Sequence, residues 1–210
     1  VGENGVTFSG PGSMVDITAA GQLIIDTGIQ ASGTVTVSGG VADSDDSAEL
    51  GLIMTTASGI TVTGDEIGGT VLVNSDSGME IMGRVVSGAN ILQTFNDDGD
   101  MIAETFQWSE IDSTVKIEAA GQAFIGGNTY DRDDNAVEVG GTILANEQVT
   151  VVGGTSADSV GVIIQGASVV ATHNADSSIL IDATDNADIF GLLLAGGDVT
   201  VSRDTNGGLL

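Results

Sequence analysis

The chain has 210 residues, of which 41% are hydrophobic, so it has enough apolar residues to fold and is not a disordered acidic tail. Acidic residues number 30 against four basic ones, and the formal net charge of −26 would repel nucleic acid and anionic membranes. The absence of cysteine excludes disulfides, thiolate catalysis and cysteine-based zinc or iron–sulfur sites, and no apolar run is long enough for a membrane-inserted helix. A charge this large favours a setting in which salt or divalent cations screen it, so we expect an extracellular or cell-surface location.

The sequence predicts short β-strands throughout. Apolar residues alternate with period two, Val, Ile, Thr and Gly are abundant, and the usual helix formers Lys, Arg, Glu and Gln are scarce. About twenty short strands at spacings of roughly 8 to 12 residues, bounded by Gly, Asn, Asp or Ser, are typical of an all-β protein. In chain order the expected strands cover 14–18, 22–26, 33–38, 49–54, 59–64, 69–74, 79–83, 84–88, 90–95, 113–119, 122–127, 136–141, 142–146, 148–154, 160–166, 167–172, 177–183, 188–197 and 198–202.

The way in which these strands are connected favours a solenoid over a sandwich or a barrel. Two-residue hairpin turns are rare, and the segments between strands vary in length, as the corners of a solenoid allow. The core must be narrow, because the chain has only five Phe, one Trp and one Tyr beside many small and branched aliphatic residues. We therefore predict one continuous parallel β-solenoid over residues 1–210, a single-stranded β-helix with about three short strands in each turn.

Internal repetition supports this fold. The segment VDITAAGQLII at 15–25 returns as VKIEAAGQAFI at 115–125, and VTVSGG at 35–40 returns as VTVVGG at 149–154. We expect a degenerate repeat of about 15–90 and 115–210, with turns of about 23 to 27 residues starting near Val137, Val160 and Ala187 in the last third. The end segments VGENGVTF and TNGGLL do not look like caps, so the solenoid ends are predicted to be uncapped and to meet flanking repeats or other copies of the protein.

The repeating pattern also resembles a known family. The segments VEVGGTILANEQVTVVGG (137–154) and ADIFGLLLAGGDVTV (187–201) are similar to the β-helical repeats of filamentous-haemagglutinin-like exoproteins and related giant bacterial surface adhesins. The resemblance covers most of the chain and implies a long right-handed parallel β-helix, secretion across a Gram-negative outer membrane, and roles in adhesion, aggregation and biofilm. The extreme acidity of this chain and the absence of the family's secretion module depart from the family pattern.

Three acidic clusters are candidate calcium sites, because calcium prefers several oxygen ligands from flexible turns. The best candidate contains Asn96, Asp98, Asp100 and Glu104, at spacings that match positions 1, 3, 5 and 9 of a calcium loop. Met101 stands where that loop needs glycine. The alternative is that the clusters are solvated corner loops, so Ca²⁺ is a possible but not a required cofactor. The two other clusters contribute the possible ligands Asp43 and Asp45, and Asp131 and Asp133.

Residues 92–111 interrupt the strand pattern and are expected to form a protruding insertion. They hold Phe95, Phe106 and the single tryptophan, Trp108, in a chain that is otherwise poor in aromatics. One reading is a contact patch for a neighbouring filament or a receptor, since aromatic residues are favoured at interface centres. The other reading is a local apolar cluster that covers the flank of the solenoid.

Catalysis has little support in the sequence. The single histidine, His173, lies in the polar segment THNADSS, which leaves no basis for a Ser-His-Asp arrangement. A β-helical polysaccharide-active enzyme is the alternative, and it predicts a groove with a basic residue beside carboxylates. We expect no enzyme but a structural segment of a secreted surface fibre or adhesin, with a cell-surface receptor or polysaccharide as a possible partner. The next alternative is a self-assembling filament or surface-layer subunit that polymerises through open solenoid ends.

Overall fold

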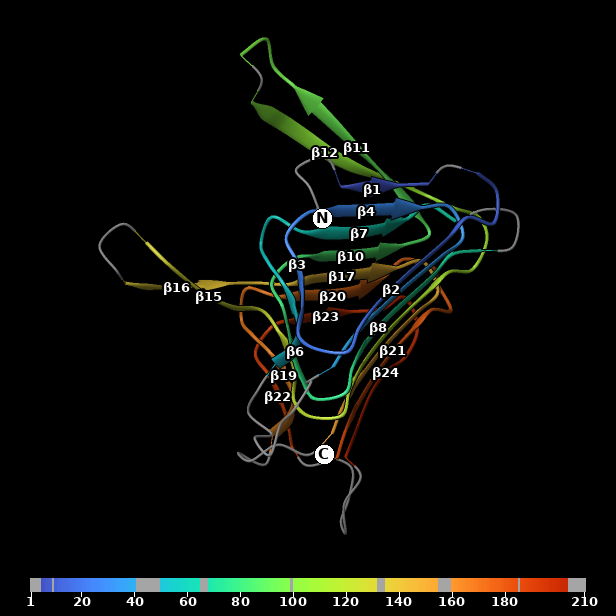
Figure 1. Cartoon of the computed structure of the whole chain (residues 1–210). Helices are drawn as coiled ribbons and strands as arrows, with labels where there is room; N and C mark the ends of the chain where they lie inside the picture. Colours follow the sequence, from blue (N-terminus) through green and yellow to red (C-terminus); the bar gives the residue numbers. More distant parts are fainter. Residues whose placement is uncertain are drawn as a thin grey trace.

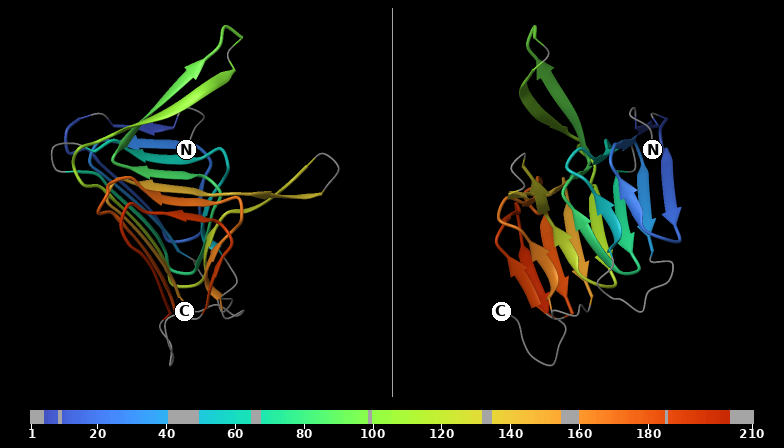
Figure 2. Two further views of the ribbon diagram at one scale, coloured as in Figure 1. Left: turned by 180° about the vertical axis from the view of Figure 1, so that it is seen from behind. Right: turned by 60° about the vertical axis from the view of Figure 1, so that its left-hand side comes forward.

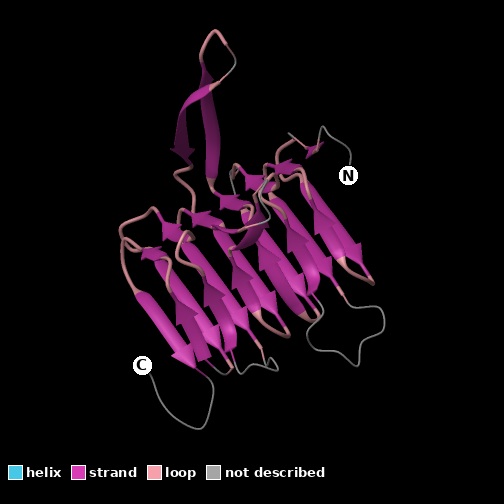
Figure 3. Ribbon diagram, turned by 90° about the vertical axis from the view of Figure 1, so that its left-hand side faces the viewer, coloured by secondary structure: helices cyan, strands magenta, loops and turns pink. Residues whose placement is uncertain are grey.

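The computed structural model describes residues 5–8, 10–40, 50–64, 68–98, 100–131, 135–154, 160–184 and 186–203. The regular elements within these ranges are all β-strands, as Figure 3 shows. In the described part of the chain no helix is long and apolar enough to cross a membrane. The prediction of an all-β protein is confirmed.

Three parallel sheets, named A, B and C here, contain most of the strands (Figure 1). Sheet A consists of β1 (Val6–Thr7), β4 (Gly28–Ala31), β7 (Gly59–Val62), β10 (Arg84–Ser87), β17 (Thr142–Ala145), β20 (Val169–Thr172) and β23 (Leu192–Leu194). Sheet B consists of β2 (Met14–Ala19), β5 (Thr34–Gly39), β8 (Thr70–Ser75), β13 (Thr114–Ala119), β18 (Gln148–Gly153), β21 (Ser178–Ala183) and β24 (Val199–Arg203). Sheet C consists of β3 (Leu23–Ile25), β6 (Leu50–Met54), β9 (Gly78–Ile81), β14 (Ala123–Ile125), β19 (Val160–Ile164) and β22 (Asn186–Ile189).

The chain visits the sheets in the fixed order B, C, A, and each passage adds one strand to each sheet. Figure 2 shows the sheets as three sides of a stack, an arrangement consistent with a parallel β-solenoid. Along sheet B, residue 14 lies beside residue 34, while residue 70 lies beside residue 114. The shortest turn therefore takes 20 residues (14 to 34) and the longest takes 44 (70 to 114). The extra residues enter at corners.

The core consists of aliphatic residues stacked in columns. Strand residues alternate between the inside and the outside, so each sheet sends every second side chain inward. On sheet A the strand register aligns Ile29, Ile60, Val85, Ile143 and Val170, each at most 1% exposed. These side chains belong to one buried cluster that draws residues from all three sheets. The narrow aliphatic core predicted from composition follows from this stacking.

The repeated segments occupy equivalent places in different turns. Each AAGQ motif connects a strand of sheet B to a strand of sheet C. Gln22 Nε2 donates to the Leu50 carbonyl oxygen at 2.8 Å, and Gln122 Nε2 donates to the Val160 carbonyl oxygen at 3.0 Å. Leu50 and Val160 are the first residues of β6 and β19, so both glutamines fasten the start of the next strand of sheet C.

The two echoes in the sequence are also parts of one corner. The second Gly of each VTVxGG motif donates its backbone N–H to the glycine of the AAGQ motif below it: Gly40 to Gly21 at 3.1 Å, and Gly154 to Gly121 at 2.8 Å. The first Gly of each VTVxGG motif, Gly39 or Gly153, lies against the next strand of sheet C. A Cβ on Gly39 would collide with the Gly51 carbonyl of β6, and a Cβ on Gly153 would collide with the Gly161 carbonyl of β19. This close approach explains why glycine is needed in both copies.

Two antiparallel hairpins project from the stack (Figures 1 and 2). The long hairpin, β11 (Ala89–Phe95) and β12 (Met101–Trp108), leaves the end of β10, and most of the segment expected to protrude lies in it. The short hairpin, β15 (Gly127–Tyr130) and β16 (Ala136–Val139), follows β14. Val137, expected to start a turn, lies instead in β16, because the alternating pattern of a hairpin strand cannot be told from that of a sheet strand. Val160 and Ala187 lie in neighbouring strands of sheet C.

Candidate functional site

The outer face of sheet A is polar in the first turns. The strand register places Thr7 of β1, Gln30 of β4 and Thr61 of β7 side by side in one column that points outward. Among the described residues, no hydrogen bond involves the side chain of any of these three. The column therefore offers free hydroxyl and amide groups to solvent or to a ligand.

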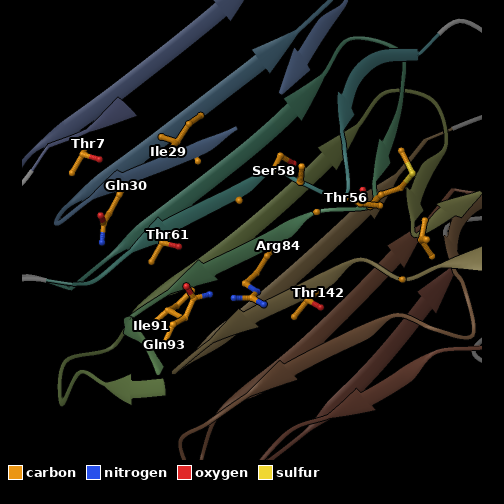
Figure 4. Close-up of a pocket in the computed structure, with 17 residues that line it drawn as sticks. Thr7, Ile29, Gln30, Thr56, Ser58, Thr61, Arg84, Ile91, Gln93 and Thr142 are labelled. Atoms are coloured by element: carbon orange, nitrogen blue, oxygen red, sulfur yellow. The ribbon is translucent and has the colours of Figure 1, made fainter. Parts of the chain in front are cut away.

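A second outward column runs parallel to the first. It contains Gly28, Gly59, Arg84 and Thr142, again in register across four neighbouring strands. Because glycine has no side chain, nothing covers the backbone of β4 and β7 at Gly28 and Gly59. The outer surface of the sheet forms a shallow depression there, called the low area below. The side chains of Arg84 and Thr142 stand at one end of this low area (Figure 4).

The low area is the floor of an open groove with a volume of about 750 Å³. Ile91 and Gln93 of β11 contribute the long hairpin's side of the groove. The corner segments 56–58 and 82–83 and the base of the short hairpin at 139–140 complete the lining. Figure 4 shows the labelled polar side chains gathered around the floor. The groove therefore lies on five neighbouring strands of sheet A, β1, β4, β7, β10 and β17, and beside both projecting hairpins.

Arg84 is held in place by the long hairpin. Its Nη1 donates to Glu104 Oε2 of β12 at 2.9 Å, and Gln93 Nε2 donates to the same oxygen at 2.9 Å. Partial burial raises the pKa of Glu104, but the hydrogen bonds from Gln93 and Arg84 and the positive charge of Arg84 outweigh it, so this pKa lies below the ordinary value. Glu104 is ionised at neutral pH, and it positions the guanidinium and neutralises its charge.

The outer face of sheet A becomes apolar in the later turns, and the base of the long hairpin covers part of it. There Ile91, Phe106 and Trp108 pack on the outward side chains of β10, β17 and β20. These form a second apolar cluster, separate from the core. Sheet A contributes Val86, Leu144, Val169 and Ala171, and Ala89 is the first residue of β11.

Of the three aromatic residues singled out in the sequence, Phe106 and Trp108 form a local apolar cluster on the flank of the stack, and only Phe95 is placed for a contact with another molecule. Phe106 and Trp108 stack on each other with centroids 5.9 Å apart, and Trp108 stacks on the His173 ring at 4.7 Å with an interplanar angle of 4°. Both belong to the apolar cluster on the flank of sheet A. Phe95 lies near the tip of the hairpin and is 54% exposed, so a contact role remains a prediction for this residue alone.

A buried asparagine fixes the return of the long hairpin into sheet B. Asn146, fully buried at the corner after β17, accepts the backbone N–H of Ser113 at 2.5 Å. Its amide donates to the carbonyl oxygens of Ser109 at 3.1 Å and Ile111 at 2.6 Å. Because one side chain holds three backbone groups of 109–113, the path by which the chain passes from β12 back into sheet B is fixed.

Several of the side chains proposed as calcium ligands have protein partners where the structure describes them. Asn96 Oδ1 accepts the backbone N–H groups of Asp98 at 3.0 Å and Asp100 at 2.8 Å, as in a closed hairpin turn. Glu104 is engaged with Arg84. The structure therefore does not bring the four oxygens of this candidate together around one point.

The other two acidic clusters are described only in part. Asp131 accepts hydrogen bonds from the backbone and side chain of Asn135 at the tip of the short hairpin. Asp133, Asp43 and Asp45 lie outside the described residues. Within the described ranges, no group of three or more His, Cys, Asp or Glu side chains could hold a metal ion. Calcium binding stays a prediction.

Sequence reasoning missed the groove. Its polar residues, Gln30, Thr61, Arg84 and Gln93, were not singled out, because none belongs to a recognised motif. A weak signal was present: the triplet Gly-Ile-polar occurs at 28–30 and again at 59–61, in two strands that prove to be neighbours. The alternation of an inward Ile with outward Gly and Gln or Thr marks a bare, polar outer face.

The groove can hydrogen-bond a polar ligand, but it has no pair of carboxylates. The enzyme alternative predicted a basic residue beside carboxylates, and Arg84 does contact Glu104. No Asp or Glu is among the described residues that line the groove. A general acid and a general base or nucleophile on opposite sides of a sugar bond need two such groups. The arrangement is suited to binding.

Comparisons with protein-family models, curated proteins and solved structures gave no match to this chain.

Proposed function

We propose that the chain is a stiff segment of an extracellular fibre or surface adhesin, built as a right-handed single-stranded parallel β-helix. The handedness follows from the strong preference of parallel strand connections for right-handed crossovers. The observation that carries the proposal is the unbroken parallel register of sheets A and B through seven strands each, with the same aliphatic columns inside. Such a stack lengthens by adding turns without changing its cross-section.

Two further features suit a fibre that makes contacts along its side. The long hairpin carries exposed apolar residues along its outer part, where Leu92, Phe95, Met101 and Ile102 are between 47% and 63% exposed. The groove lies at the base of the same hairpin. A rod that carries both would present a contact surface on its side.

Localisation tests this proposal most directly. Antibodies against the 210-residue chain should label the outside of intact cells of the source organism, and filaments shed from them, without permeabilisation. Cells that lack the gene should adhere less to surfaces and to each other. Labelling that requires permeabilisation, with unchanged adhesion of the deletion strain, would contradict the proposal.

The alternative is a separate subunit that polymerises end to end. Outward and edge residues of the last described turn support it, because Leu192 and Leu194 are 54% and 57% exposed. Sedimentation velocity of the purified chain over a range of concentrations separates the two forms. Concentration-dependent filaments favour the polymerising subunit, and a rod-shaped monomer with a longer natural gene product favours the fibre segment.

A further inference from the structure

We infer that the groove on the outer face of sheet A binds a neutral polysaccharide chain. This inference concerns the groove alone and goes beyond the fibre role; only its use in adhesion rests on the proposed function.

The floor of the groove is bare although the fold does not require it to be. A Cβ added to Gly28 would meet no other atom within 4 Å, and one added to Gly59 would meet Arg84 at 3.7 Å, an ordinary contact. Neither residue has a positive φ angle. Glycine weakens a strand, so two glycines in register without a steric reason indicate that the space above them is used.

Other glycines at the groove show what a structural requirement looks like. A Cβ on Gly140 would collide with the carbonyl of Ala167, and one on Gly83 would lie 2.7 Å from the Ser58 carbonyl oxygen. These residues must be glycine for the corners to close. Gly28 and Gly59 differ from them because only the open groove lies above their Cα atoms.

The polar groups beside the bare floor are free and regularly spaced. Thr7, Gln30 and Thr61 stand on three neighbouring parallel strands, which places them about 4.8 Å apart. Arg84 uses one N–H group for Glu104, and a guanidinium has five donors. A row of hydroxyl, amide and guanidinium groups can donate to and accept from a chain of hydroxyl-bearing residues that lies along the stack.

The charges favour a neutral ligand over an acidic one. Arg84 is the only basic residue among the described residues that line the groove, and Glu104 neutralises it. The chain carries a formal net charge of −26, which repels polyanions at long range. A polyuronate or a sulfated glycan would therefore bind more weakly than a neutral glycan of the same length.

A peptide fits the groove less well than a saccharide. Protein interfaces depend on buried apolar and aromatic anchors, whereas the outward side chains along the floor of the described groove are polar and its apolar lining residues Met82, Ile91 and Val139 lie at its sides. No aromatic ring lines the described groove, so sugar stacking is absent and a single site should bind weakly, with Kd of roughly 1 mM. Repeated copies of the groove along a fibre would convert weak sites into firm attachment through avidity.

The experiment is an NMR titration of the whole 210-residue chain with maltoheptaose, cellohexaose and laminarihexaose, with an alginate oligomer as the acidic comparison. The side-chain signals of Gln30, Gln93 and Arg84 should shift saturably with at least one neutral glycan. Gly59→Ile fills the floor with an aliphatic side chain and should weaken binding at least tenfold, and Thr61→Val should weaken it about threefold. Melting curves check that both variants fold.

Thr36→Ile is the matched control, since Thr36 is a half-buried residue on the outer face of sheet B, away from the groove. It should leave binding unchanged. Three results would overturn the inference: no saturable shift with any neutral glycan, tighter binding of alginate, or unchanged binding in a folded Gly59→Ile variant. None of these three results tests whether the chain forms fibres. Conversely, antibody labelling that is found only inside permeabilised cells would contradict the fibre proposal but would not change the ligand inferred for the groove.

Discussion

The two ends of sheet A share one backbone and one kind of interior but differ completely on the outside. In the first turns the outward column reads Thr7, Gln30 and Thr61. From the fifth strand of the sheet onward, the same column reads Leu144, Ala171 and Leu194. The inward column beside it stays aliphatic from Ile29 to Leu193, whose side chain packs against the core.

This contrast separates what builds the fold from what gives the surface its role. The inner columns repeat because each turn must cover the one below it, and they vary only among small aliphatic residues. The outer face has no such constraint. Its apolar half is partly covered by the base of the long hairpin, and its polar half is left open as the groove. Function should therefore be sought on outward residues.

The largest effect is expected from breaking the interior that both halves share. Ile143 is fully buried in the middle of the inner column, and Thr142 beside it points outward into the groove. Ile143→Ala should lower the free energy of unfolding by about 3 kcal/mol, because it leaves a cavity between two turns. Thr142→Ala should change it by less than about 0.5 kcal/mol. Urea denaturation followed by circular dichroism measures both, and equal effects would contradict the division into inner and outer columns.

A smaller and local effect is expected when the base of the long hairpin no longer packs on the apolar half of the outer face of sheet A. Trp108 packs on the second apolar cluster and on the His173 ring. Trp108→Ala should detach the base of the hairpin and destabilise the chain by about 1 to 2 kcal/mol, less than for a fully buried tryptophan because this one is half-buried. Amide hydrogen exchange in β11 and β12 should increase while exchange in sheet B stays the same.

Phe95→Ala is the matched control for this variant, because Phe95 lies on the same hairpin but is exposed near its tip. It should leave hydrogen exchange at the base unchanged. Faster exchange at the base in this control would show that the tip also holds the hairpin on the sheet.

The sequence predicted an all-β protein because the signal for short strands is local and repeated. Alternation with period two marks each strand, and the aliphatic composition requires a narrow core. The repeated AAGQ and VTVxGG motifs were also readable, and in the structure they form one corner in which Gln22 and Gln122 hold equivalent strand starts. Turn length was not readable, because hairpins such as β15 and β16 enter at corners and have the same alternation as the strands of the stack.

The candidate site was not predictable in the same way. The groove brings together Gln30, Arg84 and Gln93 from different turns and a hairpin, and their proximity depends on strand register and on the course of β11. Aromatic and acidic clusters attract attention in a sequence, yet here Trp108 covers a sheet face and Asn96 closes a turn. A lone arginine becomes noticeable only when its partner Glu104 is seen beside it.

The smallest effect is expected for Glu80, an outward residue whose neighbours are partly apolar. On the outer face of sheet C, Glu80 lies between Ile53 and Phe124 of the neighbouring strands, and its Oε1 lies over the backbone of Gly127. Burial raises the pKa of Glu80 above the ordinary value. The folded state therefore binds this proton more tightly than the unfolded chain does, so stability falls as pH rises from the ordinary carboxylate range through the raised pKa.

Glu80→Gln removes that penalty and should raise the free energy of unfolding at pH 7 by about 0.5 kcal/mol, with a smaller gain at pH 4 where the wild-type carboxyl is increasingly protonated. Any loss of a negative charge also reduces repulsion in this acidic chain. Asp188→Asn on β22 controls for that, because it makes the same charge change at an exposed position on the same sheet. Thermal melts of both variants across this pH range separate the two causes. An equal gain in stability would assign the effect to net charge. A larger gain for Glu80→Gln would assign it to the apolar neighbours, and outward positions of the stack would then differ in polarity according to the residues that flank them.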